Sequence, residues 1–384
     1  QDIKIANSRE IIFWSKSYQN VRNNLGHIYT EANFKDKKKI ISGSGQLINQ
    51  IQPIYFNNHL CKIESNGSLR CFDLQTKKLD LEIDLKPKNK NKFEILRGGI
   101  SYFDDKIIYV DAYGQIKLID IIDKNIIWEN DINVPILSSP LIYRGYIYFV
   151  SSDNKIYALN FDDGSIEWTF QTISENKKNI LTPSLSAIEN LVIVPFSNGE
   201  LISFKYDDGR PIWSENISKV SLVSNFDIKD IIGSPVIDGS NVFTISSNGK
   251  LVSTNVINGK TNWSINISGS RTPIISGNVL FVIDSDSRLI CINSLNGDIY
   301  WISNLKKYRK GNDSKDLNRW NGPFLINNLL YNISYFGELI INSPLNGEIL
   351  TKENIGIKGL LTQPIILKDT IYISDEKSNV FQYK

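Results

Sequence analysis

Hydrophobic and polar positions alternate along this chain in short runs separated by polar turns. The clearest example is residues 140–168, PLIYRGYIYFVSSDNKIYALNFDDGSIEW, where three alternating runs are followed by a fourth that carries Trp168. A period of two, interrupted by Gly, Asn and Asp, is typical of antiparallel strands joined by tight turns. Strands this short cannot bury their apolar faces alone, so the unit requires neighbours of the same kind.

The same unit recurs along the whole chain. Its middle turn is marked in successive repeats by Gly67, Gly114, Asn154, Gly199, Gly249, Ser287, Gly337 and Ser378. Neighbouring marks are roughly 38 to 50 residues apart, the spacing of four-stranded propeller blades. The sequence therefore predicts an all-β fold, an eight-bladed β-propeller of four-stranded antiparallel blades that forms a single domain over residues 1–384.

Two residue types keep a constant distance from the turn mark. Trp168 follows Asn154 and Pro140 precedes it at the same interval; Trp recurs at this place in five repeats, with Leu81 and Thr351 in two others, and Pro recurs in six. Proline is tolerated where a strand begins, because no ladder hydrogen bond is lost there. We expect the tryptophans to fill the gaps between blades, with each indole N–H reaching a neighbouring carbonyl.

The ends of the chain carry incomplete repeats. Residues 11–15, IIFWS, resemble a fourth strand with no first three before it, whereas the last repeat ends at Val380–Tyr383 without a fourth strand. We expect residues 1–20 to supply the outer strand of the last blade. This pairing would close the ring and remove its open edges.

Charge and hydropathy exclude several classes of protein. The chain has 43 Lys and Arg against 41 Asp and Glu, a formal net charge of +2. This balance disfavours a protein built to bind nucleic acid or an anionic membrane. No apolar run reaches the roughly 18 residues of a membrane-spanning helix.

Three cysteines are too few for a disulfide framework. Cys61 and Cys71 flank the Asn66-Gly67 turn, but a two-residue hairpin would pair position 61 with 72 and direct the two thiols to opposite faces. We therefore expect Cys61, Cys71 and Cys291 to be small buried residues in strands.

No pattern of catalytic or metal-binding residues is visible. The carboxylate pairs at 162–163 and 207–208 stand directly before glycines in the register of the turns, and His27 and His59 lie in different contexts. There is no Gly-x-Ser-x-Gly elbow and no phosphate-binding glycine loop. The sequence predicts no catalytic residue, metal or cofactor. The connections from each Trp to the next Pro vary in length, and such loops are where a rigid scaffold usually mounts its function.

The repeat, with its Gly and Trp ending, resembles the propeller repeat of pyrroloquinoline-quinone proteins. Quinone-dependent dehydrogenases share it with the BamB family, lipoprotein subunits of the outer-membrane β-barrel assembly machinery. The chain length, the eight repeats, an N-terminal strand with Trp14, residues 227–239 and Asn321-Gly322-Pro323 all resemble BamB. The dehydrogenases carry adjacent cysteines and a calcium site of Glu, Asn and Asp, and no two cysteines are adjacent here. A quinone-dependent dehydrogenase and a generic secreted protein-binding propeller are the alternatives.

The resemblance implies a non-enzymatic scaffold at the periplasmic face of the outer membrane of a Gram-negative bacterium. Its partner would be a periplasmic domain of BamA, the barrel subunit, with nascent outer-membrane proteins as a further possibility, and the scaffold would be one monomer within that complex. The family's lipid-bearing N-terminal cysteine is not among these residues, so we expect any anchor to lie upstream of Gln1 or to have been lost.

The family binds BamA through loops of two adjacent blades, which map to residues 171–182 and 216–233. The partner-binding residues expected there are Lys177, Lys178, Asp227, Lys229 and Asp230. The chain departs from the family pattern at Ile232, where a second acidic residue is usual. Residues 175–179 also replace the family's Leu-rich, Arg-containing loop.

Overall fold

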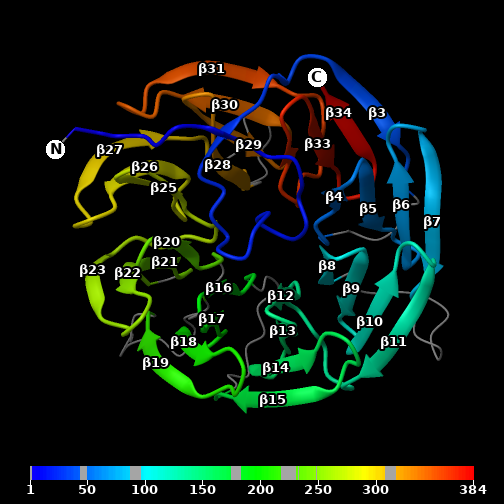
Figure 1. The fold of residues 1–384 in the computed structure, drawn as a ribbon. Helices are drawn as coiled ribbons and strands as arrows, with labels where there is room; N and C mark the ends of the chain where they lie inside the picture. Colours follow the sequence, from blue (N-terminus) through cyan, green and yellow to red (C-terminus); the bar gives the residue numbers. More distant parts are fainter. Residues whose placement is uncertain are drawn as a thin grey trace.

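The computed structural model describes residues 2–43, 50–86, 97–173, 183–217, 231, 233–247, 249–307 and 317–384. All regular structure in these residues is β-strand, and the strands form eight sheets arranged in a ring around a central axis (Figure 1). Within each sheet, four strands run antiparallel from an inner strand at the axis to an outer strand at the rim. The predicted eight-bladed propeller is confirmed.

Blades 1 to 4 follow the order of the chain from inner to outer strand. Blade 1 is β4 (Ile54–Phe56), β5 (His59–Ile63), β6 (Ser68–Asp73) and β7 (Lys78–Asp84). Blade 2 is β8 (Gly98–Phe103), β9 (Lys106–Asp111), β10 (Gln115–Asp120) and β11 (Asn125–Asp131). Blade 3 is β12 (Leu141–Tyr143), β13 (Tyr146–Val150), β14 (Lys155–Asn160) and β15 (Ile166–Gln171). Blade 4 is β16 (Ser186–Ile188), β17 (Leu191–Pro195), β18 (Glu200–Lys205) and β19 (Pro211–Asn216).

Blades 5 to 8 continue around the ring. Blade 5 is β20 (Val236–Asp238), β21 (Asn241–Ile245), β22 (Leu251–Asn255) and β23 (Thr261–Ile265). Blade 6 is β24 (Ile274–Ser276), β25 (Val279–Ile283), β26 (Arg288–Asn293) and β27 (Ile299–Asn304). Blade 7 is β28 (Trp320–Ile326), β29 (Leu329–Ser334), β30 (Glu338–Asn342) and β31 (Ile349–Asn354). Blade 8 is β32 (Ile365–Ile366), β33 (Ile371–Ser374), β34 (Val380–Tyr383) and, at the rim, β3 (Lys37–Ile41).

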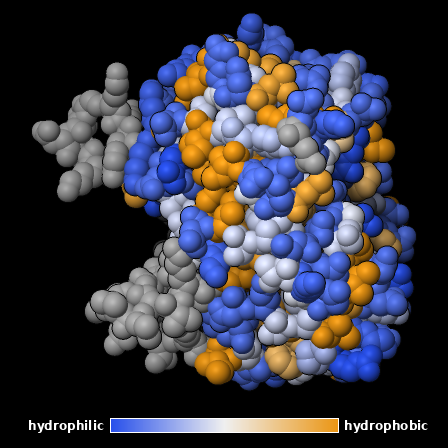
Figure 2. All heavy atoms as spheres, turned by 90° about the vertical axis from the view of Figure 1, so that its left-hand side faces the viewer, coloured by the Kyte–Doolittle hydropathy of each residue, from blue (hydrophilic) through white to orange (hydrophobic). Residues whose placement is uncertain are grey.

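Burial follows the position of a strand in its blade. The middle strands are apolar on both faces, as in the buried run Ile147–Val150 of β13, because each blade is packed between two others. The outer strands alternate instead, and β15 buries Trp168 between exposed neighbours. Figure 2 shows the resulting rim, on which hydrophobic residues lie among hydrophilic ones. A strand with one covered face needs only every second residue to be apolar.

The turn and strand-start residues lie where the repeat predicts. Gly67, Gly114, Asn154 and Ser287 all have positive φ, as tight turns require. A proline immediately precedes the inner strand in blades 1, 3, 5, 6 and 8, at Pro53, Pro140, Pro235, Pro273 and Pro364. Pro323 differs, because it lies inside β28 where the pairing with β29 is interrupted between Asn321 and Phe324.

The strand that completes blade 8 is β3, and the prediction that residues 1–20 supply it is wrong. Lys37 pairs with Tyr383 and Lys39 with Phe381 in an antiparallel ladder. The lysines of β3 are exposed, which suits the rim, whereas Trp14 is fully buried on the inner side of the ring. The apolar character of residues 11–15 therefore reflects burial at the axis.

Residues 2–31, which we call the N-terminal strap, cross one end of the channel (Figure 1). Trp14 and Tyr55 of β4 exchange backbone hydrogen bonds of 2.6 and 2.8 Å, and β2 (His27–Tyr29) pairs in parallel with β28 and with β1 (Arg9–Glu10). The strap bonds to every blade; its contacts on blades 2 to 6 and 8 are Ser15 to Tyr102, Ser17 to Ser139, Val21 to Ala187, Arg22 to Ile237, Ala6 to Ser276 and Glu31 to Lys368. It therefore ties all eight blades together.

Cys61 and Cys71 are buried in strands, as predicted, but they form a disulfide, so the prediction that their thiols point to opposite faces is wrong. Their α-carbons lie 4.0 Å apart because Cys61 pairs directly with Cys71 in the β5–β6 ladder. Glu64 N–H donates to Ser68, so the turn has an odd number of residues and the register differs by one from a two-residue hairpin. Cys291 is a buried free thiol, as predicted, and burial raises its pKa to about 12.

Candidate functional site

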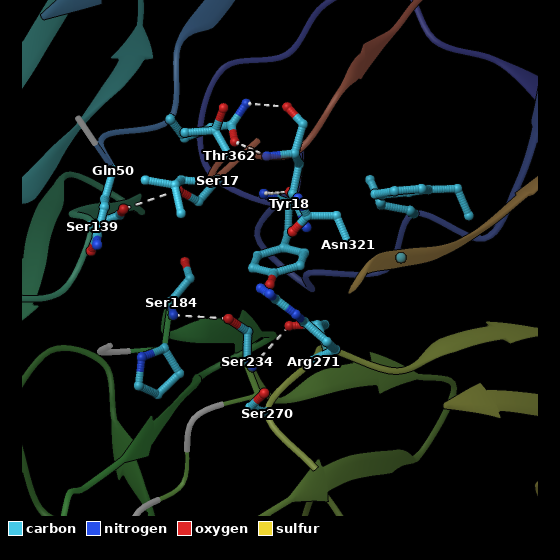
Figure 3. Close-up of a pocket in the computed structure, with 18 of the residues that line it drawn as sticks. Ser17, Tyr18, Gln50, Ser139, Ser184, Ser234, Ser270, Arg271, Asn321 and Thr362 are labelled. Carbon is cyan, nitrogen blue, oxygen red and sulfur yellow. Dashed lines mark hydrogen bonds between the residues drawn. The ribbon is translucent and has the colours of Figure 1, made fainter. Parts of the chain in front are cut away.

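The inner strands begin around a cavity of about 140 Å3 on the axis of the ring. Its walls come from residues at the starts of these strands, and Ser17 and Tyr18 of the strap reach into it (Figure 3). Leu25 of the strap lines it as well. Most of the lining is hydroxyl or amide, namely Gln50, Gln52, Ser139, Ser184, Ser234, Ser270, Thr272, Asn321, Thr362 and Gln363. The channel is therefore polar although the blades around it are apolar.

Side chains in this lining connect neighbouring blades by hydrogen bonds. Ser184 N–H donates to Ser234 Oγ and Ser234 N–H donates to Thr272 Oγ1, each at 2.9 Å. On the other side of the channel, Gln363 N–H donates to Gln52 Oε1 at 2.8 Å and Gln52 Nε2 donates to the Gln363 carbonyl at 3.1 Å. These bonds satisfy backbone groups at the strand starts that no ladder reaches.

Tyr18 stands at the centre of the channel floor, and its phenol points toward Arg271 (Figure 3). Its N–H donates to Gln363 Oε1 at 3.2 Å, which holds the strap against blade 8. Burial raises the pKa of Tyr18, while hydrogen bonds with Thr272 and Ser234 and the charge of Arg271 oppose that shift. Burial lowers the pKa of Arg271, which Tyr18 partly offsets.

The charge of the channel comes from two arginines. Arg97 and Arg271 line it, and no Asp, Glu, His or Cys does so among the described residues. Burial lowers the pKa of Arg97 as well. Within the same part of the chain, no three His, Cys, Asp or Glu side chains are grouped to hold a metal. Within the described lining, the channel thus combines hydroxyl and amide groups with positive charge.

The two ends of the channel differ. The strap bonds to the carboxyl ends of inner strands, as at Tyr102 and Ser276, and also reaches their amino ends, where Asn23 donates to the carbonyls of Ser184 and Pro235. The connections from one blade to the next enter at the amino ends of inner strands, at the opposite mouth. The expected partner-binding loops, 171–182 and 216–233, are two of these connections in the sequence, and most of their residues lie outside the described part of the chain.

The five residues expected to bind a partner, Lys177, Lys178, Asp227, Lys229 and Asp230, lie outside the described residues. The first loop is anchored where it leaves blade 3, because Thr172 N–H donates to the Asn154 carbonyl at 3.1 Å and Asn154 Nδ2 donates to that of Ile173 at 3.1 Å. The second starts from Ile217, whose carbonyl accepts from Ser246 Oγ at 3.2 Å. Ile173 is 79% exposed at the start of the first loop.

Sequence reasoning missed the strap and the channel residues that it presents. Residues 16–24 have no alternating pattern that would place them on the axis, and Arg271 is one of many arginines and lysines in the chain. The only local signal is Trp14, whose size predicts burial without saying where.

Comparison with known proteins gives consistent matches. The family model described as outer membrane protein assembly factor BamB matches residues 65–303. Curated proteins of that name from Yersinia pestis and Moranella endobia are 24% and 23% identical over 220 and 214 residues, covering 54% of this chain in each case. Those alignments cover 54% and 55% of the two relatives, so the chain spans about half the length of the curated relatives it matches.

Solved structures show the same fold over nearly the whole chain. BamB from Moraxella catarrhalis matches with a TM-score of 0.75 at 16% identity, covering 91% of this chain and 100% of that one. A europium-containing methanol dehydrogenase matches with a TM-score of 0.72 at 12% identity, covering 94% of this chain and 89% of the enzyme. At such identities, the likeness concerns the fold alone.

Proposed function

Because the chain belongs to the family of the outer membrane protein assembly factor BamB, we propose that it is a non-enzymatic scaffold of outer-membrane β-barrel assembly. Its partner is the periplasmic region of a BamA-type barrel subunit, and it acts as a monomer in that complex at the periplasmic face of the outer membrane. Its relatives carry the name assembly factor, and this observation carries the proposal. The described residues contain no helix long and apolar enough to span a membrane.

The residues at which the loops 171–182 and 216–233 start support binding of a partner through these two loops. The described starts of the two loops, at residues 172–173 and 217, follow the outer strands of the adjacent blades 3 and 4. These starting residues are hydrogen-bonded to turns of blades 3 and 5. Ile173 adds an exposed apolar side chain beside the charged residues expected to bind. An apolar anchor within a polar rim is the usual composition of such an interface.

The likeness to methanol dehydrogenase does not extend the proposal to redox chemistry. It concerns the propeller itself, which supports many unrelated functions. The two cysteines that are bonded lie within the β5–β6 hairpin of blade 1, in a direct cross-strand pair. A bound quinone in the purified protein, visible in its absorbance spectrum, would contradict the scaffold proposal.

Capture by an immobilised BamA-type periplasmic fragment tests the loop assignment. The variant Lys177→Glu with Asp230→Lys reverses one charge on each loop at constant net charge and should weaken capture about tenfold, as the loss of interface anchors does. The matched control is Asp123→Lys with Lys260→Glu, on turns at the opposite end of the ring, and should bind normally. Equal affinities for the two variants would refute the loop assignment, and no capture of the unmodified protein would refute the BamA-type partner.

A further inference from the structure

The contacts between blades follow one rule. In five blades, a tryptophan of the outer strand donates its indole N–H to a carbonyl in the last turn of the next blade, at 2.9–3.1 Å. The pairs, from blades 2 to 6, are Trp128 with Phe161, Trp168 with Tyr206, Trp213 with Val256, Trp263 with Ser294 and Trp301 with Pro344. Each indole fills the wedge between two blades at the rim.

A glycine of the receiving turn belongs to the same contact. A Cβ added at Gly164 would lie 2.7 Å from the Trp128 indole, and one added at Gly297 would lie 3.0 Å from Trp263. Gly209, Gly259 and Gly347 face the preceding tryptophan in the same way. The indole therefore requires a glycine opposite it, and the two residues occur together in five junctions.

At the junction of blades 8 and 1, both members of this pair are replaced. Trp168 pairs with Ala158, the fourth residue after the turn mark Asn154, and the equivalent residue after Ser378 is Gln382, which pairs with Lys38. Lys38 thus occupies the tryptophan position. Opposite it, Lys77 has φ 59° and occupies the glycine position of the blade 1 turn.

The replacement leaves a cavity of about 730 Å3 at this junction. Its apolar walls are Ile40, Ile41, Phe72, Leu74 and Tyr372. The Leu74 carbonyl stands where other turns accept the indole N–H, because Leu74 N–H donates to Asn58 as Phe161 N–H donates to Gly145. The pocket therefore retains an apolar wall and an acceptor for an indole that the chain does not itself supply.

The junction of blades 1 and 2 also lacks the tryptophan but is filled differently. Leu81 takes its place and is 3% exposed. Lys124, at the glycine position, donates to the carbonyl and to Oδ1 of Asp80 at 2.8 and 2.9 Å. Lys77 has no such bond within the described residues. Of these two junctions, the one between blades 8 and 1 thus combines a cavity with a lysine that has no such bond within the described residues.

The charge around the pocket is strongly positive. Six lysines line it, namely Lys35, Lys37, Lys38, Lys39, Lys77 and Lys384, against Asp36 and Asp73. The Asp73 carboxylate already accepts hydrogen bonds from the N–H groups of Gln75 and Thr76 and from the Thr76 hydroxyl. The pocket also borders β3, whose outer edge pairs with no strand of its sheet. An extended segment can therefore lie along an open edge that carries lysines.

We propose that this pocket binds an acidic, extended segment of a partner protein, which inserts an aromatic side chain between blades 8 and 1. The aromatic ring takes the place that tryptophan occupies in five other junctions, and its acidic neighbours pair with the lysines of β3 and with Lys77. This site lies at the rim and is independent of the loops 171–182 and 216–233.

Fluorescence anisotropy with a labelled ten-residue peptide of Glu and Ser around one Trp tests the proposal. The variant Lys38→Trp with Lys77→Gly restores the indole–glycine pair, should raise the unfolding temperature and should weaken peptide binding about tenfold or more. Replacing the peptide's Trp by Ala should weaken binding to the unmodified protein equally. Unchanged peptide binding by the variant with the restored indole–glycine pair would overturn the proposal.

A second variant, in which lysines are replaced by glutamates, tests the proposal if the variant with the restored indole–glycine pair does not fold. Lys38→Glu with Lys77→Glu should abolish peptide binding, and the matched control Lys352→Glu with Lys358→Glu, on exposed lysines of β31 and of the segment that follows it, should retain it. Phosphatidylglycerol vesicles separate a peptide site from a general anionic surface. Vesicle binding in the absence of peptide binding, or equal losses in the two lysine variants, would overturn the proposal.

Discussion

At the scale of single residues, the contact between blades depends on a tryptophan, which has a large side chain, and on a glycine, which has none. Trp128 donates to the Phe161 carbonyl, and Gly164 leaves the space into which the indole ring packs. The glycine has a second role, since its φ of 72° is a conformation that L-residues rarely adopt. A repeat that keeps Gly before Trp in sequence thus records two separate contacts, one with each neighbouring blade.

A pair of glycine variants in blade 3 separates these roles. Gly164→Ala should lower the free energy of unfolding by about 1–3 kcal/mol more than Gly145→Ala, because overpacking against a buried ring adds to backbone strain. Gly145 has φ 80° but nothing within 4 Å of an added Cβ, so its variant reports the strain alone. Urea unfolding of both variants measures the difference. Equal losses of unfolding free energy in the two variants would mean that the Trp128 indole moves aside without an energetic cost.

At the scale of elements, the N-terminal strap is held by polar groups taken out of water. Asn23 is fully buried and donates to the carbonyls of Ser184, Leu185 and Pro235, which join blades 4 and 5. Lys16 donates to Asn23 Oδ1 at 2.7 Å and to the Ser17 carbonyl at 2.7 Å. These bonds satisfy the ammonium, but burial still lowers the pKa of Lys16 to about 7.

The lowered pKa of Lys16 predicts a pH dependence of stability. Between the folded pKa of about 7 and an unfolded value of about 10.4, the unfolded chain binds a proton that the folded chain does not. Stability contributed by this group therefore rises as pH rises from 7 to 9 and is lost as pH falls toward 7. Tyr18, whose pKa is raised, does not titrate in this window.

Urea unfolding at pH 7 and pH 9 tests this slope. The unmodified protein should gain stability relative to Lys16→Met as pH rises, because methionine keeps the packing of the side chain but carries no proton to exchange. Comparing the two proteins cancels the titration of every other group. Parallel pH profiles would show that Lys16 keeps its charge in the folded state.

At the scale of the whole molecule, two separate segments near the N-terminus join the blades. The strap bonds to all eight blades at one end of the channel, while β3 pairs with β34 at the rim. A propeller blade contacts only its two neighbours, so a segment that touches every blade adds long-range connections that the repeat lacks. The two segments therefore stabilise the ring in different ways.

Two truncations distinguish these contributions. Deleting residues 2–24 removes most of the strap but keeps β2 and β3, and should lower the unfolding temperature by about 5 °C or more while the β-sheet circular dichroism is retained. Deleting residues 2–41 also removes β3, exposes the edge of β34 and should abolish cooperative unfolding. The same melting curve for both truncations would show that β3 does not hold blade 8.

The sequence by itself determined the architecture of this protein. Positive φ at Asn154, a proline before β12 and an indole between blades at Trp168 are local requirements, repeated often enough to be recognised without coordinates. The resemblance carried by these repeats was also sufficient to identify the family. Such local patterns recur because each turn and each strand restricts which residues can occupy its own positions.

Only the tertiary structure decided which distant segments meet. Residues 11–15 and 37–41 both suit a β-strand, and burial of Trp14 at the axis is what assigned the rim to β3. Cys61 met Cys71 because one residue in a turn shifts the register of a ladder. The vacant wedge between blades 8 and 1 likewise exists only where the two ends of the chain are joined. Such outcomes depend on packing between parts of the chain that are far apart in sequence, and no local pattern records it.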